Sequence, residues 1–508
     1  MSQNLVHKIV LTFLFTVGLV TAWNSSGFHH VDEHFQIIEF SGLKLGINKA
    51  SDLAWEYKSQ IRPAFQVLIA YVVFSASDFV GINSPFTKTF LLRLITLLFS
   101  WWTSWVFVNR FSKHFQLKKL EQHLLLYLMV GLWFIPFLSV RFSSETWGGI
   151  FLLLALAYAH GNHEKPSNLL WIGVFSGFSF ICRNQMAFAI IPLILYLIYY
   201  FRESKKNIGS FVIGAFTALS LGVIIDYWFY GKLVFTALSN FYYNIIKGVA
   251  SSFGEEGPAY YIDVIMHYPT LTLGFILLLC IITLLVFKPK NLLLWVVLSF
   301  VIGHSIIAHK EPRFLFPIAF LSGPIIFLAI RETLIRLNLS KNGTKLITFL
   351  AIILVGFNLV GSLVMFSSAA GAGNTEIHQY FSNKTQSGQH INMMHLSGTN
   401  PYNPISNLPI KFYQNPNLNQ IHIKDLSQLQ KTALKFDDAV PTFFVIRNAQ
   451  LNNEAVQCFI KQNGFVLKNR SVPKWLSYIN KHHASHRWGH FLLVYERTGI
   501  NKSFLQTD

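Results

Sequence analysis

Long apolar runs separated by short polar loops are the feature that most constrains the fold of this chain. The chain has 508 residues, of which 52% are hydrophobic and only 13% charged, whereas a soluble protein has about a quarter charged residues. Runs long enough to cross a hydrocarbon core of about 30 Å begin near residues 8, 86, 122, 146, 168, 186, 208, 268, 291, 314 and 345. The sequence therefore predicts an all-α polytopic membrane protein with about eleven transmembrane helices.

The basic loops between these runs predict the topology. Loops rich in Lys and Arg face the cytoplasm, and four such loops occur: RFSKHFQLKK (110–119), FRESKK (201–206), KPK (288–290) and RETLIRLNLSKNGTK (331–345). All four share one side only if the further run 63–80 does not span, so we expect a re-entrant or surface helix there. The N-terminus is then inside, and the first run is an uncleaved helix rather than a signal peptide because ten more follow it.

Charge and cysteine content exclude several classes of partner. The net charge of +18 comes from 41 basic and 23 acidic residues, and the basic residues cluster between apolar runs, which indicates membrane topology and anionic headgroups rather than nucleic acid. Three cysteines predict no structural disulfide. His29 and His30 are adjacent but lack the further ligands that zinc requires, so we expect neither a metal nor a cofactor.

The C-terminal part of the chain has a different composition. Residues 367–508 are polar and rich in Asn, with short β-like runs at TFFVIRN (442–448) and HFLLVYER (490–497). We therefore divide the chain into a membrane catalytic domain, 1–366, and a small mixed α/β extracytoplasmic domain, 367–508. The topology places this second domain and several polar motifs on the outer face of the membrane.

The segment HVDEHFQIIEF (30–40) carries the first group of acidic residues on that face. At 100° per residue in a helix, Asp32, Gln36 and Glu39 share one polar stripe, while Glu33 turns aside. The stripe offers a base with polar neighbours. The alternative is that Asp32 and Glu33 merely favour a helix N-terminus.

Four cations also fall on the outer side, where the insertion bias does not favour positive charge: Arg141, Arg183, Lys310 and Arg313. Together they suit a phosphate group, although each alone could be an interfacial anchor. Glu145 and Glu311 are candidates to pair with these cations and orient them. Asn240 and Asn244, among aromatic residues of the loop 229–248, suit sugar hydroxyls, although aromatic belts at membrane interfaces are common.

Two segments resemble the signatures of a known family. HVDEHFQIIEF and HKEPRFLFP (309–317) resemble those of glycosyltransferase family 22, membrane mannosyltransferases that elongate glycosylphosphatidylinositol anchors and lipid-linked oligosaccharides. LAWEYKSQIRP (53–63), RFSSET (141–146) and DYWFYGKLVFTALSNFYYN (226–244) follow in the expected order. The segment MHLSGTNPYNP (394–404) lies where eukaryotic members carry a Cys-containing, Pro-bounded segment, and it lacks the Cys. RNQ (183–185) also departs from relatives, which more often follow the Arg with Pro or a small residue.

The resemblance implies a GT-C fold and a polyprenyl- or dolichyl-phosphate mannose donor. It assigns the catalytic carboxylate to Asp32 with Glu33 beside it, and it makes His309, Lys310 and Arg313 candidates for binding the donor phosphate. Gln36, Arg62, Arg141, Arg183, Asn240 and Asn244 complete the predicted substrate-binding set. The acceptor is then a glycolipid or lipid-linked glycan.

The chemistry needs few groups. When a sugar is transferred from a lipid phosphate, the lipid phosphate leaves as an anion. The enzyme must therefore supply a base for the acceptor hydroxyl and cations for the leaving group. Direct displacement with one base predicts inversion at the anomeric carbon. Other possibilities are another GT-C transferase, such as a protein O-mannosyltransferase, a lipid or oligosaccharide transporter, and a catalytically dead scaffold. The Lys, Ile and Asn content favours a bacterial plasma membrane, with the endoplasmic reticulum as the alternative.

Overall fold

The computed structural model describes residues 3–161, 165–199, 205–336, 341–386, 388–405, 408–424, 439–475, 478 and 491–498. The chain falls into two compact units, each assembled from separate segments. The first comprises Met1–Trp23, Trp55–Val73 and Leu91–Phe366, and the second comprises Asn24–Ala54, Phe74–Phe90 and Ser367–Asp508. The segment HVDEHFQIIEF therefore belongs to the same unit as the C-terminal residues. The division into domains at residue 367 stays a prediction.

The first unit is helical. Its long helices are α1 (Gln3–Asn24), α6 (Pro85–His114, whose residues up to Phe90 belong to the second unit), α7 (Lys119–Gly131), α9 (Ser144–Ala159), α10 (Pro166–Cys182), α11 (Ala187–Tyr199), α12 (Lys205–Tyr230), α15 (Leu271–Phe287), α16 (Leu292–Ile306), α18 (Ser322–Arg336) and α19 (Lys341–Phe366). Shorter helices lie between them: α4 (Trp55–Ser59), α5 (Phe65–Phe79, which continues into the second unit), α8 (Phe134–Leu138), α13 (Thr236–Phe241), α14 (Tyr260–His267) and α17 (Phe316–Ala319). Each predicted apolar run corresponds to at least one of these helices, and the run near residue 314 corresponds to both α17 and α18.

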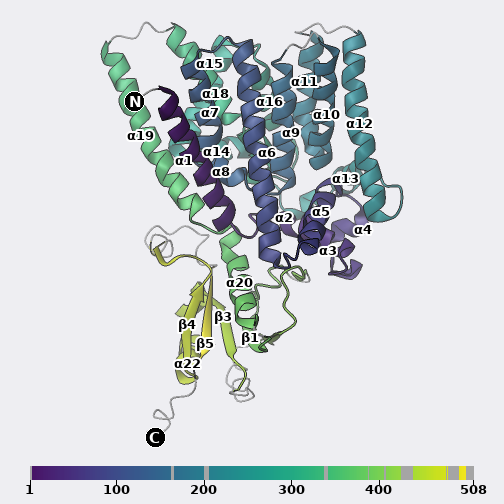
Figure 1. The fold of residues 1–508 in the computed structure, drawn as a ribbon, viewed down its shortest axis with the longest axis vertical. Helices are drawn as coiled ribbons and strands as arrows, with labels where there is room; N and C mark the ends of the chain where they lie inside the picture. The colour runs from purple at the N-terminus through teal and green to yellow at the C-terminus, as the bar shows by residue number, and fades with distance from the viewer. Residues whose placement is uncertain are drawn as a thin grey trace. The chain divides into compact units, whose positions relative to one another are not determined.

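Polar caps and close contacts explain several of the helix positions. The Asn291 side chain accepts hydrogen bonds from the backbone N–H groups of Leu293 and Leu294 at the start of α16. Helices α9, α10 and α12 pack side by side (Figure 1). A Cβ on Gly173 of α10 would lie 2.0 Å from the Phe211 carbonyl oxygen, and one on Gly214 of α12 would lie 2.1 Å from that of Leu170. Only glycine permits this approach of α10 and α12.

The prediction of about eleven full-length spans is not confirmed. Among the described residues, three helices are long and apolar enough to cross a membrane: Asn4–Asn24, Pro85–His114 and Ile208–Tyr230. Pro312–Ala319 and Ser322–Arg336 would add a fourth if they form one span bent by 61°. The shorter apolar helices found among the described residues have 10–17 residues. Helix α5 has 15 residues, as do α16 and α18. Its length therefore does not distinguish it from the helices of the predicted spans, and the expectation that 63–80 does not span stays a prediction.

The second unit contains a small sheet, as predicted. Its strands are β1 (Ile391–Leu396), β2 (Leu418–Ile423), β3 (Thr442–Arg447), β4 (Phe465–Arg470) and β5 (Leu492–Arg497). They are ordered β2-β1-β3-β5-β4 (Figure 1), with β1 parallel to both β2 and β3 and with β5 antiparallel to β3 and β4. Strands β3 and β5 lie within the two β-like runs of the sequence.

Two helices accompany this sheet. Phe459 of α22 (Glu454–Gln462) packs in a buried cluster with Phe444 and Phe465, while Phe381 of α20 (Asn374–Thr385) contacts Phe443 with ring centroids 5.5 Å apart. The predicted mixed α/β character is therefore confirmed. Residues 201–204 and 337–340, which belong to two of the basic loops, lie outside the described residues.

Candidate functional site

A buried carboxylate holds two of the predicted cations together in the first unit. Glu145, in the first turn of α9, accepts from Arg183 Nη1 at 2.7 Å and from Arg313 Nη1 at 3.0 Å, both through Oε1. All three side chains are less than 10% exposed. The face of Phe314 also contacts both guanidinium groups, at 4.7 Å from Arg183 and 5.4 Å from Arg313. The predicted pairing of Glu145 with the cations is therefore present.

The segment HKEPR completes this charge cluster, which we define as Glu145, Arg183 and residues 309–313. Glu311 accepts from Arg313 through two bonds, Nε to Oε2 at 2.7 Å and Nη2 to Oε1 at 3.1 Å. His309 Nε2 lies 3.1 Å from Glu311 Oε1, and its Nδ1 lies 2.9 Å from the Gly254 carbonyl oxygen. Pro312 begins the 3-10 turn η6 (Pro312–Leu315), which fixes the direction of Arg313.

Lys310 differs from the two arginines in this cluster. Its side chain is buried, and Nζ donates to the backbone carbonyl oxygens of Glu256 at 2.7 Å and Ala308 at 3.4 Å. Among the described residues, no carboxylate forms an ion pair with it. A buried ammonium held only by carbonyl dipoles lacks the full compensation that a counterion gives. This position therefore suits an anionic ligand.

The first unit also contains the predicted binding residues Arg141, Arg62, Asn240 and Asn244. Arg141 follows α8, is 1% exposed and has its guanidinium 5.2 Å from the centroid of the Phe137 ring. Arg62 Nη2 lies 3.8 Å from Glu56 Oε1, and the Arg62 carbonyl oxygen accepts from the Tyr230 hydroxyl. Asn240 lies in α13, and Asn244 lies in the π-helical segment η4 (Tyr242–Ile246). Their assignment to substrate binding stays a prediction.

Asp226 is a polar group that the sequence reasoning did not single out. It is 4% exposed, and its carboxylate accepts from the Ala64 backbone N–H at 2.7 Å and from the Thr236 hydroxyl at 2.9 Å. The available signal was an acidic residue near the end of an apolar run, which is a strong pointer in a membrane protein. Here the carboxylate connects α12 to Ala64, which precedes α5, and to Thr236, the first residue of α13.

The proposed base belongs to the second unit. Asp32 and Glu33 lie in the short helix α2 (Val31–Glu33), and the Asp32 side chain is 21% exposed. The Asp32 backbone N–H donates to His30 Nδ1 at 3.2 Å, so His30 is the N-cap. Asp32 thus occupies a helix N-terminus, as the alternative interpretation expected, and its side chain is partly exposed.

The polar stripe predicted for this segment is wrong. After α2 the backbone forms a π-helical turn, η1 (His34–Ile38), before α3 (Glu39–Lys44). A π turn contains more residues than the 3.6 of an α-helix, so the 100° spacing that aligned Asp32, Gln36 and Glu39 does not apply. Gln36 is 8% exposed and Glu39 only 1%. Glu39 therefore does not share an accessible face with Asp32.

Glu39 instead fixes the C-terminal part of the chain to this segment. Its Oε1 accepts from the backbone N–H groups of Lys411 at 2.9 Å and Phe412 at 3.1 Å, and lies 2.7 Å from His34 Nε2. Its Oε2 accepts from Asn48 Nδ2 at 2.7 Å. Four donors around one buried carboxylate indicate that Glu39 has a structural role in this segment.

We expect Glu39→Gln to destabilise the second unit. The amide NH2 cannot accept, so at least one buried donor loses its partner, at a cost of about 1.5–3 kcal/mol. A lower melting temperature of the full chain in nanodiscs checks this expectation. Glu454→Gln, at an exposed position on α22, is the matched control and should change little. Equal melting temperatures for the two variants would contradict the structural role.

Known proteins similar to this chain identify its family. Residues 9–413 match the Alg9-like mannosyltransferase family. The chain belongs to this family. It is similar to GPI mannosyltransferase 3 of Candida albicans, with 26% identity over 61% of this chain and 61% of that protein. It is also similar to GPI mannosyltransferase 3 of Drosophila melanogaster, with 25% identity over 69% of this chain and 60% of that protein.

A solved structure supports the fold of this Alg9-like chain. The crystal structure of ArnT from Cupriavidus metallidurans bound to undecaprenyl phosphate matches with a TM-score of 0.53 and 9% identity, covering 98% of this chain and 99% of that chain. The predicted resemblance to family 22 is confirmed. The similarity to ArnT also confirms the GT-C fold. The chain spans about three fifths of the length of the two GPI mannosyltransferases above.

Proposed function

We propose that the chain is an inverting mannosyltransferase that moves mannose from a polyprenyl- or dolichyl-phosphate donor to a hydroxyl of a glycolipid or lipid-linked glycan. The observation that carries this proposal is the buried Lys310 ammonium within the charge cluster of an Alg9-like chain. The names of the similar proteins support a glycolipid acceptor, and the ArnT complex, which holds undecaprenyl phosphate, supports a lipid-phosphate donor.

The proposed reaction is a single displacement. Asp32 takes the proton from the acceptor hydroxyl as the new bond between that oxygen and C1 of mannose forms. The bond between C1 and the phosphate oxygen breaks, and the lipid phosphate leaves with the electron pair. Lys310 and Arg313 stabilise the negative charge of the leaving phosphate, and Glu145 and Glu311 hold the Arg313 guanidinium in a fixed orientation.

The paired state of Arg313 makes Lys310 the sharper probe of donor binding. Arg313 is neutralised by two carboxylates, so its removal would also disturb Glu145 and Arg183. Removing the Lys310 ammonium leaves only two backbone carbonyl oxygens without that donor. A loss of donor affinity in a Lys310 variant can therefore be attributed to the phosphate contact more directly.

We expect Lys310→Met to raise the KM for polyprenyl-phosphate mannose and to lower kcat/KM by about 10²-fold or more, as removal of a buried group that stabilises an oxyanion does. The assay uses purified protein, labelled donor and a panel of glycolipid acceptors. Lys113→Met, at an exposed position of α6, is the control. If Lys310→Met transfers mannose with the same KM and kcat/KM as the wild type, Lys310 does not bind the donor phosphate. If the wild type transfers mannose from none of the donors, the proposed function is wrong.

We propose that transfer takes place on the extracytoplasmic face of the membrane. The proposal applies to a bacterial plasma membrane, where transfer would face the periplasm, and to the endoplasmic reticulum, where it would face the lumen. The stereochemistry is a further readout of the same assay. A β-linked donor should give an α-linked product, because one base and one displacement invert the anomeric carbon.

A further inference from the structure

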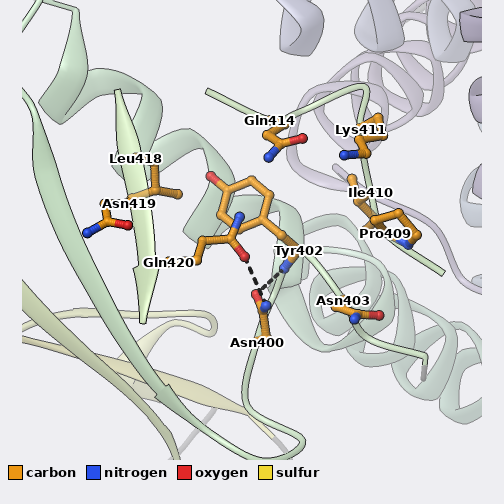
Figure 2. Close-up of a pocket in the computed structure, with 10 residues that line it drawn as sticks. All are labelled: Asn400, Tyr402, Asn403, Pro409, Ile410, Lys411, Gln414, Leu418, Asn419 and Gln420. Carbon is orange, nitrogen blue, oxygen red and sulfur yellow. Dashed lines mark hydrogen bonds between the residues drawn. The ribbon is translucent and has the colours of Figure 1, made fainter. Parts of the chain in front are cut away.

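An open pocket of about 300 Å³ lies within the second unit, between strand β2 and the loop that precedes it (Figure 2). Among its ten lining residues five are amides and none is a carboxylate. The polar groups that the argument uses are Asn400, Lys411, Gln414, Asn419 and Gln420. Such a lining offers paired donors and acceptors with little net charge.

Part of this lining is fixed, and part is open to a ligand. Asn400 Nδ2 donates to Gln420 Oε1 at 3.0 Å, while Asn400 Oδ1 accepts from the Tyr402 backbone N–H at 2.9 Å (Figure 2). The Gln420 amide is thereby oriented, and its NH2 makes no hydrogen bond to the described residues. The exposed Gln414 side chain and the Lys411 ammonium likewise make none. These groups can meet a bound molecule without breaking existing bonds.

We propose that this pocket binds hexose units of the acceptor glycan, an inference that rests on the proposed function. A hydroxyl both donates and accepts, and an amide side chain does the same, so oriented amides match neighbouring sugar hydroxyls. A phosphate would be better served by several cations, whereas the lining supplies only Lys411. The chemistry therefore favours a neutral sugar over an anion.

The pocket wall is joined to the segment that carries Asp32. The Lys411 backbone N–H, in that wall, donates to Glu39 Oε1. Glu39 directly follows the π-helical turn η1, which itself follows Asp32 and Glu33. The second wall is connected as well, because the Ile410 backbone N–H donates to the Tyr402 carbonyl oxygen at 2.8 Å. The pocket wall is thus hydrogen-bonded to Glu39, which lies seven residues after the proposed base in the same segment.

The test measures binding separately from transfer. Saturation-transfer NMR with α-linked mannobiose, on the full chain in nanodiscs, should show binding to the wild type. The double variant Gln414→Ala/Gln420→Leu should weaken it by about tenfold or more, since two hydrogen bonds are lost. In the transfer assay the same variant should raise the KM for the acceptor and leave the KM for the donor unchanged. Gln386→Ala, at an exposed position outside the pocket, should match the wild type.

The outcomes separate the pocket from the reaction. Binding of mannobiose that the double variant loses, in a protein that transfers no mannose, would support the pocket and overturn the proposed function. Transfer with an acceptor KM that the double variant does not change would overturn the pocket and leave the proposed function standing. Displacement of mannobiose by inorganic phosphate would also contradict the proposal, because it would identify an anion site.

Discussion

Asp32→Asn should abolish mannosyl transfer, with a fall in kcat of about 10³-fold, while the protein still folds and inserts. The amide cannot take the acceptor proton, and a positioned general base contributes about 10²–10⁴-fold. Folding should be spared because the carboxylate is partly exposed and the bond from the Asp32 backbone N–H to His30 does not depend on the side chain. The measurement is turnover of labelled polyprenyl-phosphate mannose, together with the melting temperature of each variant.

The neighbouring carboxylate provides the control. Glu33→Gln removes an acidic side chain from the same short helix, and one base is sufficient for a displacement whose leaving group needs no proton. We therefore expect this variant to keep most of its activity. If Glu33→Gln loses activity and Asp32→Asn does not, the base is Glu33. Turnover retained by Asp32→Asn would in any case exclude Asp32 as the base.

Glu145→Ala should strongly destabilise the first unit. Its removal leaves the buried guanidinium groups of Arg183 and Arg313 without the carboxylate that they share, and breaking a buried ion pair in this way costs about 3–5 kcal/mol. A marked fall in the melting temperature of the full chain checks this prediction. The variant should also transfer no mannose, because Arg313 loses one of its two orienting partners.

A second, more exposed ion pair serves as the comparison. Arg331 Nε lies 3.2 Å from Glu121 Oε1, with both side chains about a quarter exposed. Glu121 also accepts from the Lys118 backbone N–H at the start of α7, so Glu121→Ala should cost about 1 kcal/mol. Equal destabilisation by the two variants would contradict the importance of burial at Glu145.

The membrane helices were predictable because burial in lipid demands long apolar runs and satisfied backbone groups. Hydropathy alone therefore predicted that a helix lies near each of the expected starts. It did not predict their lengths, because the short segments RNQ and HKEPR end α10 and separate α16 from α17 through hydrogen bonds and ion pairs that composition does not reveal. The pairing of Glu145 with Arg183 and Arg313 was predictable, since opposite charges in an apolar chain must compensate one another.

The geometry around Asp32 was less predictable for a physical reason. A regular helix assigns one angle to each residue, so the sequence predicted a stripe through Gln36 and Glu39. The π turn of η1 changes that angle, and it coincides with contacts between His34, Glu39 and the backbone of Lys411 and Phe412, far along the chain. No local pattern contains those distant partners. The pocket beside β2 was missed for the same reason, since its walls meet only after β1 and β2 have paired.

The Glu39 contacts also set an order for biosynthesis. The hydrogen bond from the Lys411 backbone to Glu39 joins residues 372 positions apart, and chain closure over such a distance is slow compared with local helix formation. The ribosome synthesises Glu39 early, but the backbone N–H groups of Lys411 and Phe412 that donate to it are made only after the helices of the first unit. The region around the proposed base is therefore among the first to be synthesised and among the last to reach its final conformation, so a polypeptide interrupted before residue 411 should remain catalytically immature.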